Sequence, residues 1–232
     1  MLAVVRVKIR LKETTGKGVV ALQTANMDKV WRRVIRNHKK WDGDGARAVY
    51  LTHRSLREDV SLILDAKNAD SIGNYISKHV APMKEVAGIR IITFMNPRFF
   101  VPSKGTPRGM KRFTIAVSVK PNHLDEVYEY LSNFSPNKGL APAYLAYTFN
   151  GLGRDISFSV FCRGGTTLKK FVDTYLNTHE GILDTKTTYI SHSKRLVPRE
   201  EWKKVIKHMM VKMGDFEMEE FEDFDEDWMA SC

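Results

Sequence analysis

Residues 59–76 read DVSLILDAKNADSIGNYI and residues 155–172 read DISFSVFCRGGTTLKKFV, two stretches that match at a constant separation of 96 residues. In each stretch an acid opens an apolar run typical of a buried strand, and apolar side chains at helical spacing follow it. At the same separation Thr52 matches Thr148. A coincidence would have to reproduce both the periodicity and the identities, so we interpret the match as an internal duplication.

Alternation, helical spacing and turn residues predict the order βαββαβ in each half of the chain. The first strand is expected to be half-buried, with Val5 and Val7 facing a core and basic side chains facing away. The first half is predicted to form strands at 3–11, 46–52, 59–64 and after Gly88, with helices at 20–38 and from a cap at Asp70 or Ser71 to residue 80. The second half is predicted to form strands at 113–119, 143–150, 155–161 and 184–191, with helices at 123–134 and 167–178.

The predicted fold class is therefore α+β, with two tandem ferredoxin-like βαββαβ units of the dimeric αβ-barrel type. The expected domains are a first module at 1–101, a second at 108–198, an amphipathic helix at 199–214 and an acidic tail at 215–232. In such a unit both helices cover one face of the sheet, which leaves the other face free. In the second half that free face is expected to carry the small side chains of Thr114, Ala116, Ser118 and Ser157 or Ser159.

Charge is unevenly distributed along the chain. The protein carries 37 Lys and Arg against 27 Asp and Glu, a net charge of +10. Nine of the acids lie in residues 215–232, which contain no Lys or Arg, so residues 1–214 carry a net charge of +19. Such a charge attracts polyanions, of which nucleic acid is the commonest in a cytoplasm, although simple solubility or a thermophile's use of Lys and Arg are the alternatives.

Composition excludes several classes of protein. With 43% hydrophobic and 28% charged residues the chain is typical of a globular protein. It contains no apolar run near the roughly 18 to 20 residues of a membrane span and no signal-peptide pattern at the N-terminus, so we expect a cytoplasmic protein. Cys162 and Cys232 cannot build a disulfide framework, and the seven histidines lack ligand spacing, so neither a metal site nor a cofactor is expected.

Basic side chains on two expected elements form a candidate nucleic-acid-binding surface. They lie on the outer face of the first strand and on and after the first helix, and the first 40 residues carry a net charge of +9. The predicted contact residues are Arg6, Lys8, Arg10, Lys12, Arg32, Arg33, Arg36, Lys39 and Lys40. Because the first strand offers no exposed aromatic ring for base stacking, the expected contacts are to phosphates.

The C-terminal region combines an apolar stripe with a charged tail. The stripe past Pro198 predicts an amphipathic helix that ends at Gly214 and packs on its own domain or at an oligomer interface. It consists of Trp202, Val205, Ile206, Met209, Met210 and Met213. The tail interleaves six large apolar side chains among its nine acids, which indicates a segment that binds something.

Turn residues in the second half resemble those of a known family. Gly151, Gly153 and Asp155 stand at a turn before a strand, and Gly181-Ile182 precedes Thr187 or Thr188 in the last strand. This pattern is similar to the C-terminal effector-binding (RAM-type) module of the leucine-responsive Lrp/AsnC regulators, and the first half repeats it more weakly. The resemblance implies a dimeric αβ-barrel and a small-molecule site at Gly151, Gly153 and Asp155. Regulators of this family carry an N-terminal helix-turn-helix, whereas the first predicted strand here begins at residue 3.

These observations predict a non-enzymatic, nucleic-acid-associated regulatory protein of Lrp/AsnC-like type that forms a homo-oligomer and senses a small molecule. An RNA- or ribosome-binding factor is the first alternative, because phosphate contacts suit structured RNA equally well. A small cofactor-independent αβ-barrel enzyme is the second, on fold analogy. No catalytic residue is predicted, since Ser191-His192-Ser193 has no convincing third partner for nucleophilic catalysis.

Overall fold

The computed structural model describes residues 1–10, 19–54, 59–101, 109–136, 139–148 and 154–212. Contacts divide the chain into two compact units. The first unit comprises Met1–Thr93 and Ser191–Glu201, and the second comprises Phe94–Ile190 with the residues from Trp202 onward. Helices and mainly antiparallel strands occur in both units, which confirms the predicted α+β class. Within the described ranges no helix has the length and apolar character needed to cross a membrane.

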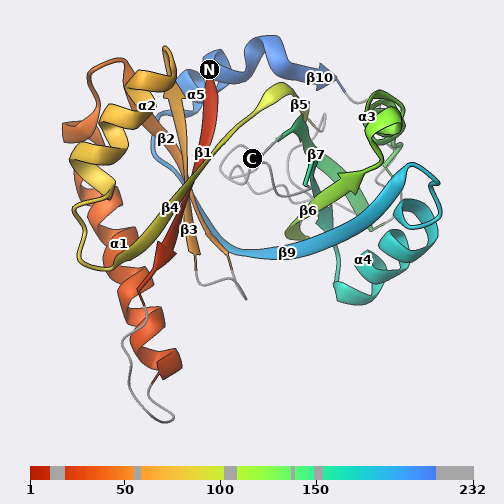
Figure 1. Ribbon diagram of the computed structural model, residues 1–232, viewed down its shortest axis with the longest axis horizontal. Helices are drawn as coiled ribbons and strands as arrows, with labels where there is room; N and C mark the ends of the chain where they lie inside the picture. Colours follow the sequence, from red (N-terminus) through yellow and green to blue (C-terminus); the bar gives the residue numbers. More distant parts are fainter. Residues whose placement is uncertain (11–18, 55–58, 102–108, 137–138, 149–153, 213–232) are drawn as a thin grey trace. The chain divides into compact units, whose positions relative to one another are not determined.

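The first unit is a sheet with helices on one face (Figure 1). Its elements are β1 (Leu2–Ile9), α1 (Val19–Trp41), β2 (Ala46–Arg54), β3 (Asp59–Ala66), α2 (Ala69–Tyr75), the π-helical turn η1 (Ile76–Val80) and β4 (Val86–Thr93). The strands pair antiparallel in the order β2-β3-β1-β4, and the end of β9 from Ser191 lies beside β2. Val30 and Val34 of α1 are fully buried in one core with Val5 and Val7 of β1.

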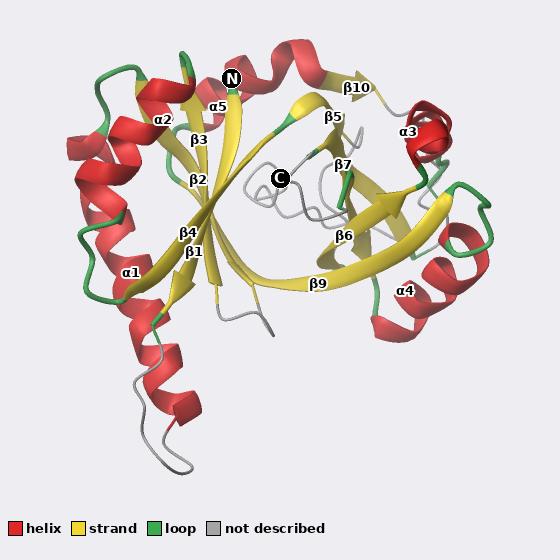
Figure 2. Ribbon diagram, in the orientation of Figure 1, coloured by secondary structure: helices red, strands yellow, loops and turns green. Residues whose placement is uncertain are grey.

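The second unit has the same layered arrangement, with α3 and α4 against one sheet face (Figure 2). Its elements are β5 (Met95–Val101), β6 (Lys111–Val119), η2 (Pro121–His123), α3 (Leu124–Ser132), β7 (Leu140–Tyr147), β8 (Ile156–Cys162), α4 (Gly165–Phe171), η3 (Val172–Leu176), β9 (Ile182–Arg195) up to Ile190, α5 (Arg199–Ile206) from Trp202 on, η4 (Lys207–Met209) and β10 (Met210–Lys212). The strand order is β10-β5-β7-β8-β6-β9, and only the β10–β5 pair is recorded as parallel among the described strand pairs.

Several corresponding elements of the two units keep the sequence separation of 96. Helices α2 and α4 occupy residues 69–75 and 165–171, and the π-helical turns that extend them occupy 76–80 and 172–176. Strands β2 and β7 each contain an irregularity in pairing with the next strand, after Ala48 and after Pro142. Each irregularity lies directly before a tyrosine, Tyr50 in the first unit and Tyr144 in the second.

Local details differ from the sequence prediction at three places. Helix α2 is capped by Asn68, whose Oδ1 accepts a hydrogen bond of 2.9 Å from the backbone N–H of Ser71, rather than by Asp70 or Ser71. Helix α5 ends at Ile206, where the 3₁₀ turn η4 begins, and Met210–Lys212 then pair with β5. Strand β5 itself was not predicted, since Pro97 lies inside it and proline argues against a strand. The predicted helix end at Gly214 and the tail lie outside the described residues.

Candidate functional site

The sheet face of the second unit opposite its helices is polar. Alternation along β6 sends Ile115 and Val117 into the core with α3 and α4, so Thr114 and Ser118 point to the other face. The pairing register places Ser159 of β8 opposite Thr114. Thr114, Ser118, Ser157 and Ser159 are all buried. The face therefore combines hydroxyl groups with exclusion from bulk water.

Arg112, near the start of β6, is a buried charged residue of this face. Its side chain follows the same alternation as Thr114, and the residue is only 7% exposed. The guanidinium Nε donates a 3.1 Å hydrogen bond to Ser159 Oγ. Ser159 Oγ in turn donates a 2.9 Å bond to the carbonyl oxygen of Phe113, so this hydroxyl is held as an acceptor toward Arg112.

Tyr144 of β7 supports the guanidinium from the side. The Arg112 Cζ atom lies 5.5 Å from the centre of the Tyr144 ring, within the range of a cation–π contact. The Tyr144 hydroxyl and Ser157 Oγ are 3.0 Å apart and share a hydrogen bond. Phe94 and Phe99 pack beside the same ring at centroid distances of 5.4 and 6.1 Å. The arrangement fixes Arg112 between a hydroxyl and an aromatic ring.

The charge of Arg112 is not compensated by the described part of the chain. Among the described residues no carboxylate forms an ion pair with Arg112, and its Nη1 atom is buried without a hydrogen-bond partner. A buried cation without a counter-charge costs several kcal/mol, in the order of magnitude known for broken buried ion pairs. The cation–π contact and the bond to Ser159 offset part of that cost. A bound anion would satisfy the remaining donor.

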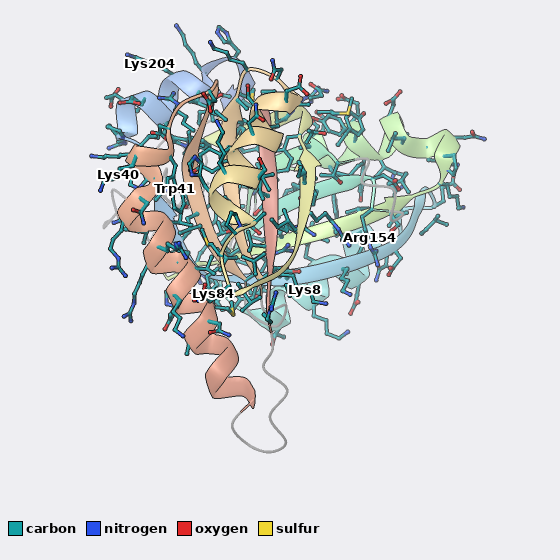
Figure 3. All side chains as sticks on the ribbon, turned by 60° about the vertical axis from the view of Figure 1, so that its left-hand side comes forward. Lys8, Lys40, Trp41, Lys84, Arg154 and Lys204 are labelled. Carbon is teal, nitrogen blue, oxygen red and sulfur yellow. The ribbon has the colours of Figure 1, made fainter. Side chains whose placement is uncertain are left out.

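The basic residues predicted to bind nucleic acid do not form one surface. Arg32, Arg33, Arg36, Lys39 and Lys40 are exposed on the outer side of α1, where Figure 3 shows Lys40. The alternation of β1 places half-buried Arg6 and exposed Lys8 on the sheet face away from α1. The sheet therefore separates the two groups, which corrects the expectation of a joint surface.

Arg10 and Lys12 are the remaining basic residues of this prediction. Arg10 follows β1 and donates from Nη2 to the carbonyl oxygen of Val86 at 3.3 Å. Lys12 lies outside the described residues. Nucleic acid, a second copy of the chain and a small-molecule effector therefore stay predictions as partners.

The residues implied by the family resemblance are only partly described. Gly151 and Gly153 lie outside the described residues. Asp155 is described, and its Oδ2 accepts a 2.9 Å hydrogen bond from the backbone N–H of Val119. Its own backbone N–H donates to the carbonyl oxygen of Val117 at 2.9 Å. These bonds hold the start of β8 against the end of β6, so the carboxylate has a structural partner.

Sequence reasoning missed Arg112 and Tyr144 as site residues. Arg112 stands in the run Lys111-Arg112-Phe113, where a charge at the start of a strand indicates a solvent-exposed end. The position of Arg112 two residues before Thr114 could have identified it, because this spacing places Arg112 on the face expected to carry small polar side chains. Histidine, cysteine and carboxylate groups in the described part of the chain form no cluster able to hold a metal ion.

Comparisons with known proteins find similar folds and no family. No protein-family model and no curated protein matches the chain. A candidate monooxygenase from Fusobacterium nucleatum subsp. nucleatum is 12% identical, with a TM-score of 0.48 over 84% of this chain and 93% of that one. An anthrone oxidase-like protein is 10% identical, with a TM-score of 0.49 over 85% and 94% of the two chains. A variant of chlorite dismutase from Candidatus Nitrospira defluvii is 9% identical, with a TM-score of 0.47 over 90% and 94%.

These similar structures correct the function predicted from the sequence. The sequence predicts a non-enzymatic, nucleic-acid-associated regulator, whereas the structures of similar fold are described as monooxygenases, an oxidase-like protein and chlorite dismutases. The non-enzymatic regulator is therefore wrong. The physical reason is that short turn motifs report the local chain path, which unrelated functions share on one fold. At this identity the similarity concerns the fold alone.

Proposed function

We propose that this protein is a small enzyme of the αβ-barrel type that binds an anionic organic substrate through Arg112. The observation that carries the proposal is the buried guanidinium, whose Nη1 has no hydrogen-bond partner among the described residues. Fixed donors in a water-excluded site interact with negative charge far more strongly than donors in water, and they need no reorganisation during a reaction. Such a site stabilises a carboxylate, or an oxygen on which negative charge develops.

The proposal includes two tandem ferredoxin-like units that arose by duplication. The equal separation of 96 residues between α2 and α4 and between the two π-helical turns supports it. Strand register makes Tyr50 the counterpart of Tyr144, and Leu2 and Ile63 the counterparts of Arg112 and Ser159. The first unit thus has apolar side chains where the second has the cation and its hydroxyl. This difference favours a substrate site in the second unit alone.

The roles of the residues follow from their contacts. Arg112 pairs with the substrate anion through Nη1, because its Nε is already bound to Ser159. Ser159 and Tyr144 position the guanidinium rather than act on the substrate. Removing one charge-assisted hydrogen bond costs about 1.5 to 3 kcal/mol, which corresponds to binding that is roughly 10-fold to 150-fold weaker.

The test is to screen small carboxylates and phenols by calorimetry against the full-length protein and two variants. Arg112→Met is expected to lose binding, while Lys111→Met, which removes an exposed charge from the same strand, is expected to keep it. Each binding anion is then incubated with the wild-type protein and analysed for product by mass spectrometry. Equal binding to the Arg112→Met variant would contradict the site. Binding without any product would contradict the enzyme.

A further inference from the structure

A serine and a histidine meet in the first unit, far apart in the sequence. His53 lies near the end of β2, and Ser191 opens the segment of β9 that belongs to this unit. Ser191 Oγ is 2.7 Å from His53 Nδ1. The same oxygen lies 3.2 Å from the backbone carbonyl oxygen of His53. Both side chains are partly exposed, so reagents in solution can reach them.

The imidazole of His53 is held by two rings. The edge of Trp31 from α1 packs against it at a centroid distance of 6.3 Å and an interplanar angle of 81°. His192 lies on another side at 5.6 Å and 85°. Burial and the neighbouring His192 lower the pKa of His53, although the charges of Asp28 and Asp59 act in the opposite direction. His53 is therefore uncharged at neutral pH, which is the form that accepts a proton.

We propose that Ser191 is a reactive nucleophile whose general base is His53, and that its substrates are small activated esters. The pair has the geometry that nucleophilic catalysis requires, a hydroxyl within hydrogen-bond distance of a neutral imidazole nitrogen. It lies in a different unit from Arg112, so this inference is independent of the proposed substrate site.

The steps balance without a further reactant besides water. Ser191 Oγ forms a bond to the ester carbonyl carbon while its proton moves to His53 Nδ1. The bond from that carbon to the alcohol oxygen breaks, and the alcohol takes the proton from His53. Water then attacks the acyl-serine, and its proton passes through His53 to Ser191 Oγ as the acid leaves. The mechanism needs the tautomer of His53 that carries its proton on Nε2.

A purely structural role for this contact gives a different arrangement of protons. If Ser191 Oγ donates to the carbonyl oxygen of His53, Nδ1–H donates to Ser191, and the hydroxyl gains no nucleophilicity. Such a contact would only join β2 to β9. Chemical reactivity separates the two arrangements, because only the first makes the hydroxyl more reactive than an ordinary serine.

The test is labelling of the full-length protein by a fluorophosphonate, followed by peptide mass spectrometry. Wild-type protein is expected to carry one phosphonyl group on Ser191, and Ser191→Ala none. Ser193→Ala, which removes the next hydroxyl on the same strand, should be labelled at the wild-type rate. His53→Gln should be labelled roughly 100-fold or more slowly, since general bases contribute about 100-fold to 10,000-fold.

A second variant keeps the proposal testable if Ser191→Ala folds poorly. Ser191→Cys should be alkylated by iodoacetamide faster than the same variant with His53→Gln, because a nearby neutral imidazole promotes formation of the thiolate. The proposal is overturned if wild-type Ser191 is not labelled, or if His53→Gln leaves both rates unchanged.

Discussion

At the scale of single residues, the fold places Arg112 and His53 in surroundings that disfavour their charged forms. Arg112 is 7% exposed and has an unpaired Nη1 among the described residues, while His53 is kept from protonation by burial and by His192. Neither arrangement is what stability alone would select, since charged forms are disfavoured where water is excluded. Each therefore leads to a measurable effect on unfolding.

Arg112→Met is expected to raise the unfolding free energy of the ligand-free protein, by about 1 to 4 kcal/mol. The physical reason is that methionine fills a similar path without a charge to desolvate. Urea unfolding at pH 7 measures the difference, with Lys111→Met as the control for net charge. A loss of several kcal/mol would mean that Arg112 is a structural cation with a counter-charge, contrary to the proposed site.

The stability contributed by His53 should depend on pH with a defined sign. Its pKa in the folded protein lies below the ordinary value of 6.5, so the unfolded chain binds more protons as the pH falls through that value. Wild-type protein should therefore lose stability toward acid more steeply than His53→Gln, starting near pH 6.5. Urea unfolding of both proteins from pH 8 to pH 5 tests this. Parallel curves of unfolding free energy against pH would show that the pKa of His53 is not lowered in the folded protein.

At the scale of elements, two glycines near the start of the last strand of each βαββαβ run have different surroundings: Gly88 lies inside β4, and Gly181 directly precedes β9. A Cβ atom at Gly181 would lie 2.7 Å from His123 Cβ and 2.9 Å from Val127 Cγ2. At Gly88 it would meet nothing within 4 Å. Gly181 thus marks the close approach of the chain before β9 to the start of α3, where its carbonyl oxygen accepts a 2.9 Å bond from the Lys120 N–H.

Gly181→Ala is expected to destabilise the protein by about 1 to 3 kcal/mol, since the added methyl group must displace packed atoms of α3. Gly88→Ala should leave stability unchanged or raise it by up to roughly 1 kcal/mol, because alanine restricts the unfolded chain. Thermal and urea unfolding of the two variants provide a matched comparison. Equal effects at both positions would refute the packing argument.

At the scale of the whole molecule, the order of the chain does not follow the division into units. Ser191–Glu201 belongs to the first unit, and the chain then returns to the second with Trp202. Trp202 is fully buried and packs its ring edge-on against Phe99 of β5 at 5.9 Å. Strand β10 follows and pairs with the same β5. The second sheet therefore depends on residues beyond its βαββαβ run.

Trp202→Ala should cost about 3 to 5 kcal/mol, as expected for removal of a buried aromatic side chain. Amide hydrogen exchange should speed up in β5 and β7 while β1 and β3 stay protected. Trp41→Ala is the matched control, because Trp41 stacks on His79 at 5.2 Å in the first unit and should loosen α1 and η1 instead. Uniform loosening of both units in either variant would show that they do not respond separately.

Local periodicity determined much of the fold from the sequence alone. Alternation along residues 3–9 and helical spacing around Val30 and Val34 predicted β1 and α1, because side-chain direction repeats every two residues in a strand and every 3.6 in a helix. The repeat at 96 residues predicted that the second half follows the same order of elements. Strands β5 and β10 could not be predicted in this way. Strand β5 is interrupted by a proline and β10 has three residues, so neither shows such a period.

Only the tertiary structure decided which distant residues meet. Arg112 reaches Ser159 and Tyr144 through the pairing of β6 with β8 and of β8 with β7, and Ser191 reaches His53 across 138 positions of sequence. A strand's own pattern sets the face on which a side chain lies. The neighbour across that face depends on strand order and register, which the packing of all the strands and helices sets together. Both candidate sites therefore arise from strand pairing, while the residues that form them are ordinary in their local sequence.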